Sequence, residues 1–223
     1  MILDTNLNKS ILKNKFDIII IGAGLSGLYL ANELKNTQKK ILIIDRGNED
    51  KNYNVENRIK NIGINHLSSQ NQNNFVLGGH SVNWGGQLAE FERIDFEKNF
   101  WGSSYSIIRG LYNEIYKEFK IKEKNSIINK LNDNLNFYNT IYLDNPNFYS
   151  RYKNIISKSK NIFLIKNLIA YDLKINDEKA EKLICKDSEN KKIEFSSENF
   201  IFNMGTFENV RFFLELKKNI KIL

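Results

Sequence analysis

The sequence predicts an α/β fold, with a Rossmann-like parallel central sheet and a β-meander late in the chain. Ile18–Ile21 and Ile41–Ile44 are short and continuously apolar, which is typical of parallel strands buried on both faces. A glycine-rich turn and an expected helix, Leu25–Leu34, lie between them and complete a β-α-β unit. Short strand-like segments separated by polar turns follow residue 161, and these indicate the meander.

The turn after the first strand has the pattern Gly-x-Gly-x-x-Gly, formed by Gly22, Gly24 and Gly27. Gly22 allows the tight turn, Gly24 lets the backbone approach a pyrophosphate closely, and Gly27 lets the helix pack against the sheet. The helix that follows would direct free N–H groups and the positive end of its dipole at the phosphates.

Asp45 stands at the tip of the second strand, where its carboxylate would accept hydrogen bonds from a ribose hydroxyl. Strand, turn, helix, second strand and acid together form the context that the dinucleotide fingerprint requires. The alternative is a glycine turn in an unrelated α/β protein, and the spacing of the strands and the acid disfavours it. The pattern therefore predicts an adenine dinucleotide, and it leaves the reaction open.

Composition excludes several other classes. The net charge is +7, but the lysines are scattered along all 223 residues without a basic stripe, so we expect no nucleic-acid partner. The single cysteine, Cys185, excludes an internal disulfide and a cysteine-based metal site, and we expect it in a strand. We assign no metal ligands. No apolar run is long enough to cross a membrane and none resembles a signal peptide, so a cytoplasmic protein is expected.

The rest of the chain alternates between polar and patterned segments. Asn48–Asn74 is polar and is expected to be a long surface excursion. An apolar residue every fourth position predicts an amphipathic helix over Ser104–Phe119, whereas Asn125–Asn161 is expected to be irregular. The later expected elements are strands at Ile162–Ile165, Leu168–Leu173, Glu181–Lys186, Lys191–Phe195 and Phe200–Phe202, and a helix at Phe207–Leu216.

A second glycine cluster, Leu77–Gln87, holds four glycines and Trp84 within eleven residues. Glycines at this density allow the backbone to lie against a flat or anionic ligand. A flexible surface loop is the alternative, although such a loop has little use for a large apolar ring between glycine pairs.

With both glycine clusters and the closing segment Asn199–Leu216, the chain resembles the N-terminal part of glucose–methanol–choline oxidoreductases, in their bacterial sugar or alcohol dehydrogenase-like branch. The resemblance covers nearly all of residues 15–218. It implies one FAD-binding domain over 1–223, with the fingerprint in 15–47, a flavin-loop and helical excursion in 48–160, and the meander with the closing strand and helix in 161–218.

The resemblance also assigns residues to the cofactor. Asn83 stands where some relatives link FAD covalently through a histidine, so non-covalent FAD is expected. Arg46 is expected near the adenine. The residues implied to contact FAD are Gly22, Gly24, Leu25, Ser26, Gly27, Asp45, Arg46, Gly78, Gly79, Ser81, Asn83, Trp84, Gly85, Leu168 and Gly205.

No residue of the chain is assigned a catalytic role. The family's C-terminal substrate domain, which carries a histidine base, is expected to be largely absent, and the histidines present are His66 and His80. The leading hypothesis is an FAD-dependent oxidoreductase acting on the CH–OH group of a sugar or alcohol, inactive as an isolated chain. The alternatives are a catalytically incomplete flavin-binding module, or subunit of a split enzyme whose partner is a separate C-terminal half, and a pyridine-nucleotide Rossmann enzyme.

Overall fold

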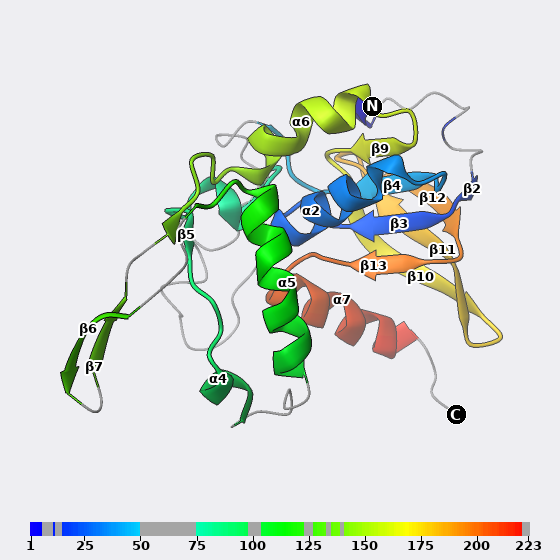
Figure 1. The fold of residues 1–223 in the computed structure, drawn as a ribbon. Coiled ribbons are helices and arrows are strands. Elements are labelled where there is room, and N and C mark those ends of the chain that lie inside the picture. The colour runs from blue at the N-terminus through cyan, green and yellow to red at the C-terminus, as the bar shows by residue number, and fades with distance from the viewer. Residues whose placement is uncertain are drawn as a thin grey trace. The chain divides into compact units, whose positions relative to one another are not determined.

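The computed structural model describes residues 1–5, 11, 15–49, 75–97, 104–122, 127–132, 135–138 and 141–219 (Figure 1). The chain divides into two compact units, one formed by Met1–Asn83 with Asn147–Leu223 and the other by Trp84–Pro146. Most of the expected excursion Asn48–Asn74, including His66, lies outside the described residues.

A five-stranded sheet forms the centre of the first unit, and every pair of neighbouring strands is parallel. The predicted parallel sheet is therefore confirmed. Ile21 lies opposite both Ile44 and Phe202, so that the strands end at the same edge. In spatial order the strands are β1 Ile2–Leu3, β9 Ile162–Ile165, β4 Ile41–Ile44, β3 Ile18–Ile21 and β13 Phe200–Phe202.

Two helices pack on one face of this sheet, and a second sheet with one helix packs on the other. The helices of the first face are α2, Leu25–Glu33, which continues into the 3-10 turn η1, Leu34–Asn36, and α6, Phe148–Lys158. The opposite layer contains β10 Ile169–Asn176, β11 Lys179–Lys186, β12 Lys192–Ser197, β2 Lys15–Phe16 and the helix α7 Thr206–Asn219. The predicted β-meander is confirmed, and β10, β11 and β12 each extend two or three residues beyond the expected bounds at one end.

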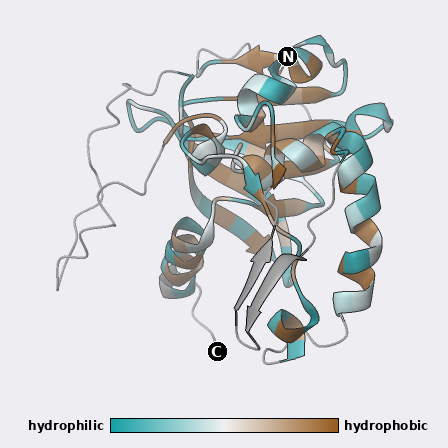
Figure 2. Cartoon of the chain, turned by 60° about the vertical axis from the view of Figure 1, so that its left-hand side comes forward, coloured by the Kyte–Doolittle hydropathy of each residue, from teal (hydrophilic) through white to brown (hydrophobic). Residues whose placement is uncertain are grey.

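Along the central strands, alternate side chains pack against the two layers on opposite faces of the sheet. Ile19 and Ile21 join a core with Phe195 of β12 and Phe212 of α7, whereas Ile20 lies beside Gly27 of α2. Figure 2 shows the resulting concentration of hydrophobic residues along the strands of the central sheet. Cys185 is buried in β11, as predicted, and burial raises the pKa of its thiol.

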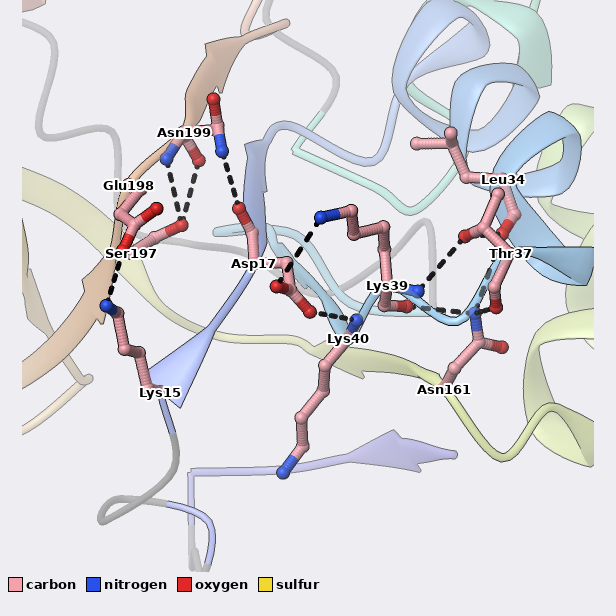
Figure 3. A network of polar contacts seen from close by, with 10 residues as sticks. All are labelled: Lys15, Asp17, Leu34, Thr37, Lys39, Lys40, Asn161, Ser197, Glu198 and Asn199. Carbon is pink, nitrogen blue, oxygen red and sulfur yellow. Dashed lines mark hydrogen bonds and ion pairs between the residues drawn. The ribbon is translucent and has the colours of Figure 1, made fainter.

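A network of hydrogen bonds and ion pairs lies at the edge of the sheet where the parallel strands begin, opposite the glycine turns (Figure 3). The Asn161 amide donates to the Thr37 and Lys39 carbonyls, at 3.0 Å each. The Asp17 carboxylate accepts from the Lys40 N–H at 2.7 Å, and the Asn199 amide donates to the Asp17 carbonyl at 2.9 Å. These bonds tie together the starts of the parallel strands, where loop backbone would otherwise lack partners.

The second unit contains the predicted amphipathic helix as α5, Ser104–Glu118. Its Tyr116 is buried, while Ile107 and Leu111 are exposed. No helix within the described ranges is both long and apolar enough to cross a membrane. The other elements of this unit are β5 Gln87–Leu88, α4 Arg93–Glu97, β6 Ile127–Asn132, β7 Leu135–Tyr138 and β8 Ile141–Tyr142.

One expectation about local structure is wrong. Asn125–Asn161 is not irregular throughout, because it contains the β6–β7 hairpin and the helix α6. Asn147 caps α6 by accepting a hydrogen bond from the Ser150 N–H, and the helix buries its aromatic face against α2 and β9. The polar N-terminus also provides an outer strand, because Ile2–Leu3 pairs with β9.

Candidate nucleotide site

The site lies where β3, β4 and β13 end side by side. The Gly22 N–H donates to the Ile44 carbonyl at 2.8 Å, and the Asn203 N–H donates to the Ile21 carbonyl at 2.7 Å. These bonds hold the three loops that follow the strands against one another. The carboxyl edge of an open parallel sheet is where α/β proteins bind ligands.

The first glycine loop has one packed side and one open side. A Cβ on Gly27 would lie 2.0 Å from the Gly22 carbonyl oxygen, so α2 approaches the strand as closely as the sequence predicts. At Gly24 a Cβ would meet nothing within 4 Å. The packed side fixes the helix, and the open side leaves space for a ligand beside the backbone.

The N-terminus of α2 faces this open side. Gly24 is its N-cap residue, no side chain caps the helix, and its first turn carries no acid. The first N–H groups of a helix have no partner within it, and together with the helix dipole they favour an anion. Leu25 and Ser26, which begin the helix, are both exposed. A phosphate group could therefore accept hydrogen bonds from this end.

The second glycine cluster joins the first. The Gly78 N–H donates to the Ala23 carbonyl at 2.8 Å, and a Cβ on Gly79 would lie 3.2 Å from the Gly24 Cα. Gly79 begins the 3-10 turn η2, Gly79–Val82. Two glycine-rich segments more than fifty residues apart in the sequence thus form one backbone surface.

Ser81 secures this second loop from the inside. Its buried hydroxyl donates to the Gly78 carbonyl at 2.7 Å and accepts from the Phe148 N–H, the first of α6, at 3.0 Å. The Ser81 side chain therefore holds the loop against α6. His80, its neighbour in η2, is exposed.

Asp45 braces the turn on which the fingerprint depends. One carboxylate oxygen accepts from the Ala23 N–H and the other from the Gly47 N–H, both at 2.6 Å. Burial raises the pKa of this carboxyl, while the two backbone donors and the charge of Arg46 lower it. Each carboxylate oxygen can accept more than one hydrogen bond, so a ribose hydroxyl can still be received.

The Arg46 side chain reaches α7. Its guanidinium lies over the Phe75 ring, 3.4 Å from the ring centroid, and its Nη1 lies 3.6 Å from Glu208 Oε2. Glu208 is in the first turn of α7 and also accepts two hydrogen bonds from Arg211, at 3.0 and 2.8 Å. The residue that the sequence places near adenine is thus part of a charged cluster.

The remaining expected residues fall in three places. Leu168 is buried, and its N–H donates to the Asp45 carbonyl at 2.9 Å. Gly205 follows β13 at the same edge, and a Cβ there would meet nothing within 4 Å. Asn83 ends the first unit, whereas Trp84 and Gly85 open the second, where the Trp84 indole donates to the Pro146 carbonyl at 2.8 Å.

Sequence reasoning missed Phe75 and Glu208. Both contact Arg46 from distant parts of the chain, and neither was assigned to the cofactor site from the sequence. The one available sequence signal for Glu208 was its place as an acid in the first turn of the helix that follows Gly205. Among the described residues, no group of His, Cys, Asp and Glu is arranged to hold a metal ion.

Comparison with known proteins supports the Rossmann-like fold of this region. Residues 20–50 match the family model of the NAD(P)-binding Rossmann-like domain. The chain is 54% identical over 33 residues to UDP-galactopyranose mutase from Mycoplasma genitalium, a match that covers 15% of the chain and 8% of that protein.

Solved structures extend the likeness to nearly the whole chain. Pyridoxine 4-oxidase from Mesorbium loti has a TM-score of 0.63 at 13% identity, covering 91% of this chain and 52% of its own. Formate oxidase from Aspergillus oryzae, studied for its FAD modification, has a TM-score of 0.61 at 14% identity, covering 91% of this chain and 48% of its own. The chain spans about half the length of these oxidases and shares with them a Rossmann-like α/β fold.

Proposed function

We propose that the chain binds FAD non-covalently and forms the cofactor-binding part of an oxidoreductase of the glucose–methanol–choline type. The observation that carries the proposal is the junction of the two glycine loops at the uncapped N-terminus of α2. A lone fingerprint would suit many nucleotides. A second glycine segment joined to the first provides the longer backbone surface that a flavin dinucleotide needs.

The residues of the junction fit the parts of FAD. The N–H groups of Leu25 and Ser26, with the open backbone at Gly24 and Gly79, would receive the pyrophosphate. Asp45 would accept from the ribose of the adenosine. Gly205 would lie close to the pyrophosphate or the ribose, because its Cα faces open space at the same edge.

When bound, FAD supplies the redox chemistry by accepting a hydride from the carbon of a CH–OH group. The residues of this chain bind and orient it. Removal of the hydroxyl proton needs a base, and substrate must be held against the flavin. The match with these 223 residues covers about half of each oxidase. We assign these two tasks to a region that corresponds to the other half, carried on the same polypeptide or on a separate one. The substrate class we propose is a sugar or an alcohol.

A flavin-binding module without catalysis is the second candidate. The specific observation in its favour is that His80, the histidine in the described part of the chain, lies in η2 within the cofactor loop. In that position it belongs to the nucleotide-binding backbone rather than to a separate substrate site.

Reconstitution with FAD followed by acid precipitation tests the proposal. We expect the folded protein to be yellow, with the colour in the supernatant after precipitation, because Asn83 offers no nucleophile for a covalent link. Colour retained in the pellet would contradict non-covalent binding. A protein that folds, by circular dichroism, and yet takes up no FAD would refute the assignment itself.

A further inference from the structure

We propose that Asp4, at the end of the N-terminal strand β1, is a positioning residue of the cofactor site. Through the side chain of Asn167 it holds the loop that supports the backbone of Asp45, so that loss of this link weakens the binding of FAD. This inference rests on the proposed function, because it requires that Asp45 receives the ribose of the dinucleotide.

The loop that follows β9 supports the backbone around Asp45. The Asn167 N–H donates to the Gly47 carbonyl at 3.2 Å, and the Leu168 N–H donates to the Asp45 carbonyl at 2.9 Å. The Asp45 N–H in turn donates to the carbonyl of Ile165, the last residue of β9, at 3.0 Å. The position of the Asp45 carboxylate therefore depends on this loop as well as on the glycine turn.

Asn167 is the strained residue of this loop. Its φ of +60° lies in the left-handed region, which a residue other than glycine occupies at a cost in free energy unless its surroundings hold it there. Its Oδ1 is buried and accepts no hydrogen bond from any residue that the structure describes. The side-chain amide is therefore held from its Nδ2 alone.

Asp4 provides the bond that holds this amide. The Asn167 Nδ2 donates to Asp4 Oδ1 at 2.9 Å, and the Thr5 N–H donates to the same oxygen at 2.7 Å, which orients the carboxylate. Leu3 lies opposite Ile165 in the parallel pair of β1 and β9, so Asp4 and Asn167 follow the strand ends at the same edge as Asp45. The N-terminal strand thus reaches the ribose-binding acid through one loop.

Three substitutions separate this role from a general effect on stability. The Asp4 side chain is 49% exposed, so Asp4→Ala should release the loop while changing the stability of the whole fold very little. Asp4→Asn keeps an acceptor oxygen for Asn167 and removes only the charge that faces the Lys166 Nζ, 3.6 Å away. Glu198→Ala is the matched control, because Glu198 is an exposed acid that pairs with Lys15 at 2.6 Å, at the edge of the sheet opposite the glycine turns.

The experiment measures FAD affinity by fluorescence titration, and it measures the hydrogen exchange of the Leu168 amide and the Tm in the unliganded protein. We expect Asp4→Ala to bind FAD about five- to tenfold more weakly, the size of one hydrogen bond. Its Leu168 amide should exchange faster than in the wild type, and its Tm should stay close to the wild-type value. Asp4→Asn and Glu198→Ala should bind FAD within about twofold of the wild type.

A double substitution identifies the route. Glycine adopts a positive φ without a side chain to hold it, so Asp4→Ala should no longer change FAD affinity in the Asn167→Gly background. Unchanged affinity in Asp4→Ala, the same loss in both backgrounds, or a loss accompanied by a large fall in Tm would overturn the inference and leave FAD binding intact. Failure of the wild type to bind FAD would overturn the proposed function, and hydrogen exchange would still show whether Asp4 holds the loop.

Discussion

At the scale of single residues, Asp45 has a structural role beyond the ribose-binding role that the sequence predicts for it. The fingerprint predicts an acceptor for a ribose hydroxyl. In the structure the same carboxylate also accepts the Ala23 and Gly47 N–H groups and so shapes the loop that would contact the phosphates. The position of the acid could be predicted from its spacing after the glycines. Its bonds to the loop could not, because they depend on how the strand ends meet.

Asp45 should make cofactor binding sensitive to acid. Because burial raises its pKa, the carboxyl adds most to the stability of the unliganded fold below the ordinary aspartate value of 3.8, and this contribution is lost as the pH rises through the raised pKa. A ribose hydroxyl donates best to the ionised form. Affinity for FAD should therefore fall as the pH is lowered through the raised pKa, before an ordinary aspartate would titrate.

Fluorescence titration of FAD from neutral pH downward, as far as both proteins stay folded, checks this expectation in the wild type and in Asp45→Asn. The variant should bind about tenfold more weakly at the upper pH and should lose the acid dependence that the wild type shows. Thermal melting of the variant provides the control for folding. Wild-type affinity in Asp45→Asn, or the same pH profile in both proteins, would show that this carboxylate does not receive the ribose.

At the scale of elements, sequence patterns predicted those helices and strands whose signals are local. The apolar runs of β3 and β4 and the glycines between them fixed the β-α-β unit. The helix α6 was missed because its buried face is made of Phe148, Tyr149 and Tyr152 within an asparagine-rich stretch. The strand β1 has two residues, and only its pairing with β9 makes it a strand. Such pairing is a tertiary effect that local propensity does not encode.

The packing of α2 against β3 should tolerate no side chain at Gly27. A methyl group there would lie 2.0 Å from the Gly22 carbonyl oxygen, so Gly27→Ala must displace the helix. Overpacking of this kind costs about 2 kcal/mol or more, which lowers Tm by roughly 4–8 °C in a chain of this size.

Differential scanning calorimetry of the unliganded protein measures this effect. Gly110→Ala is the control, because a Cβ at Gly110 in α5 meets nothing within 4 Å and alanine favours the helix. The control should melt at or above the wild-type temperature. If Gly27→Ala had the same melting temperature as the wild type, α2 would not approach β3 as closely as described.

At the scale of the whole molecule, the chain carries the proposed cofactor site, and no residue in it is assigned as a base. The structure places His80 in η2, the loop that joins the first glycine turn, and His66 lies outside the described residues. The two glycine segments that carry the family resemblance meet at one edge of the sheet. The charged cluster of Arg46, Glu208 and Arg211 was not foreseen, because Arg46 lies far from the other two in the sequence.

These 223 residues alone should therefore not oxidise alcohols or sugars at a useful rate. A positioned base contributes about 10²–10⁴-fold to such a reaction, and orientation of the substrate contributes at least as much. Anaerobic bleaching of the flavin band measures this with aldoses and primary alcohols, and dithionite serves as the positive control. Bleaching by a substrate that disappears in His80→Ala would make His80 the base and would contradict the expectation.

The binding of FAD to Gly24→Val tests the central claim most directly. Gly24 has an ordinary φ of −78°, and its Cβ would meet nothing within 4 Å, so valine should leave the fold and its melting temperature intact. Its branched side chain would nevertheless occupy the space that the pyrophosphate needs.

Gly110→Val, whose side chain also points into open space, is the control. We predict that fluorescence titration detects FAD binding in the wild type and in Gly110→Val and none in Gly24→Val. Near-normal affinity in a folded Gly24→Val protein would show that the joined glycine loops are not the cofactor site.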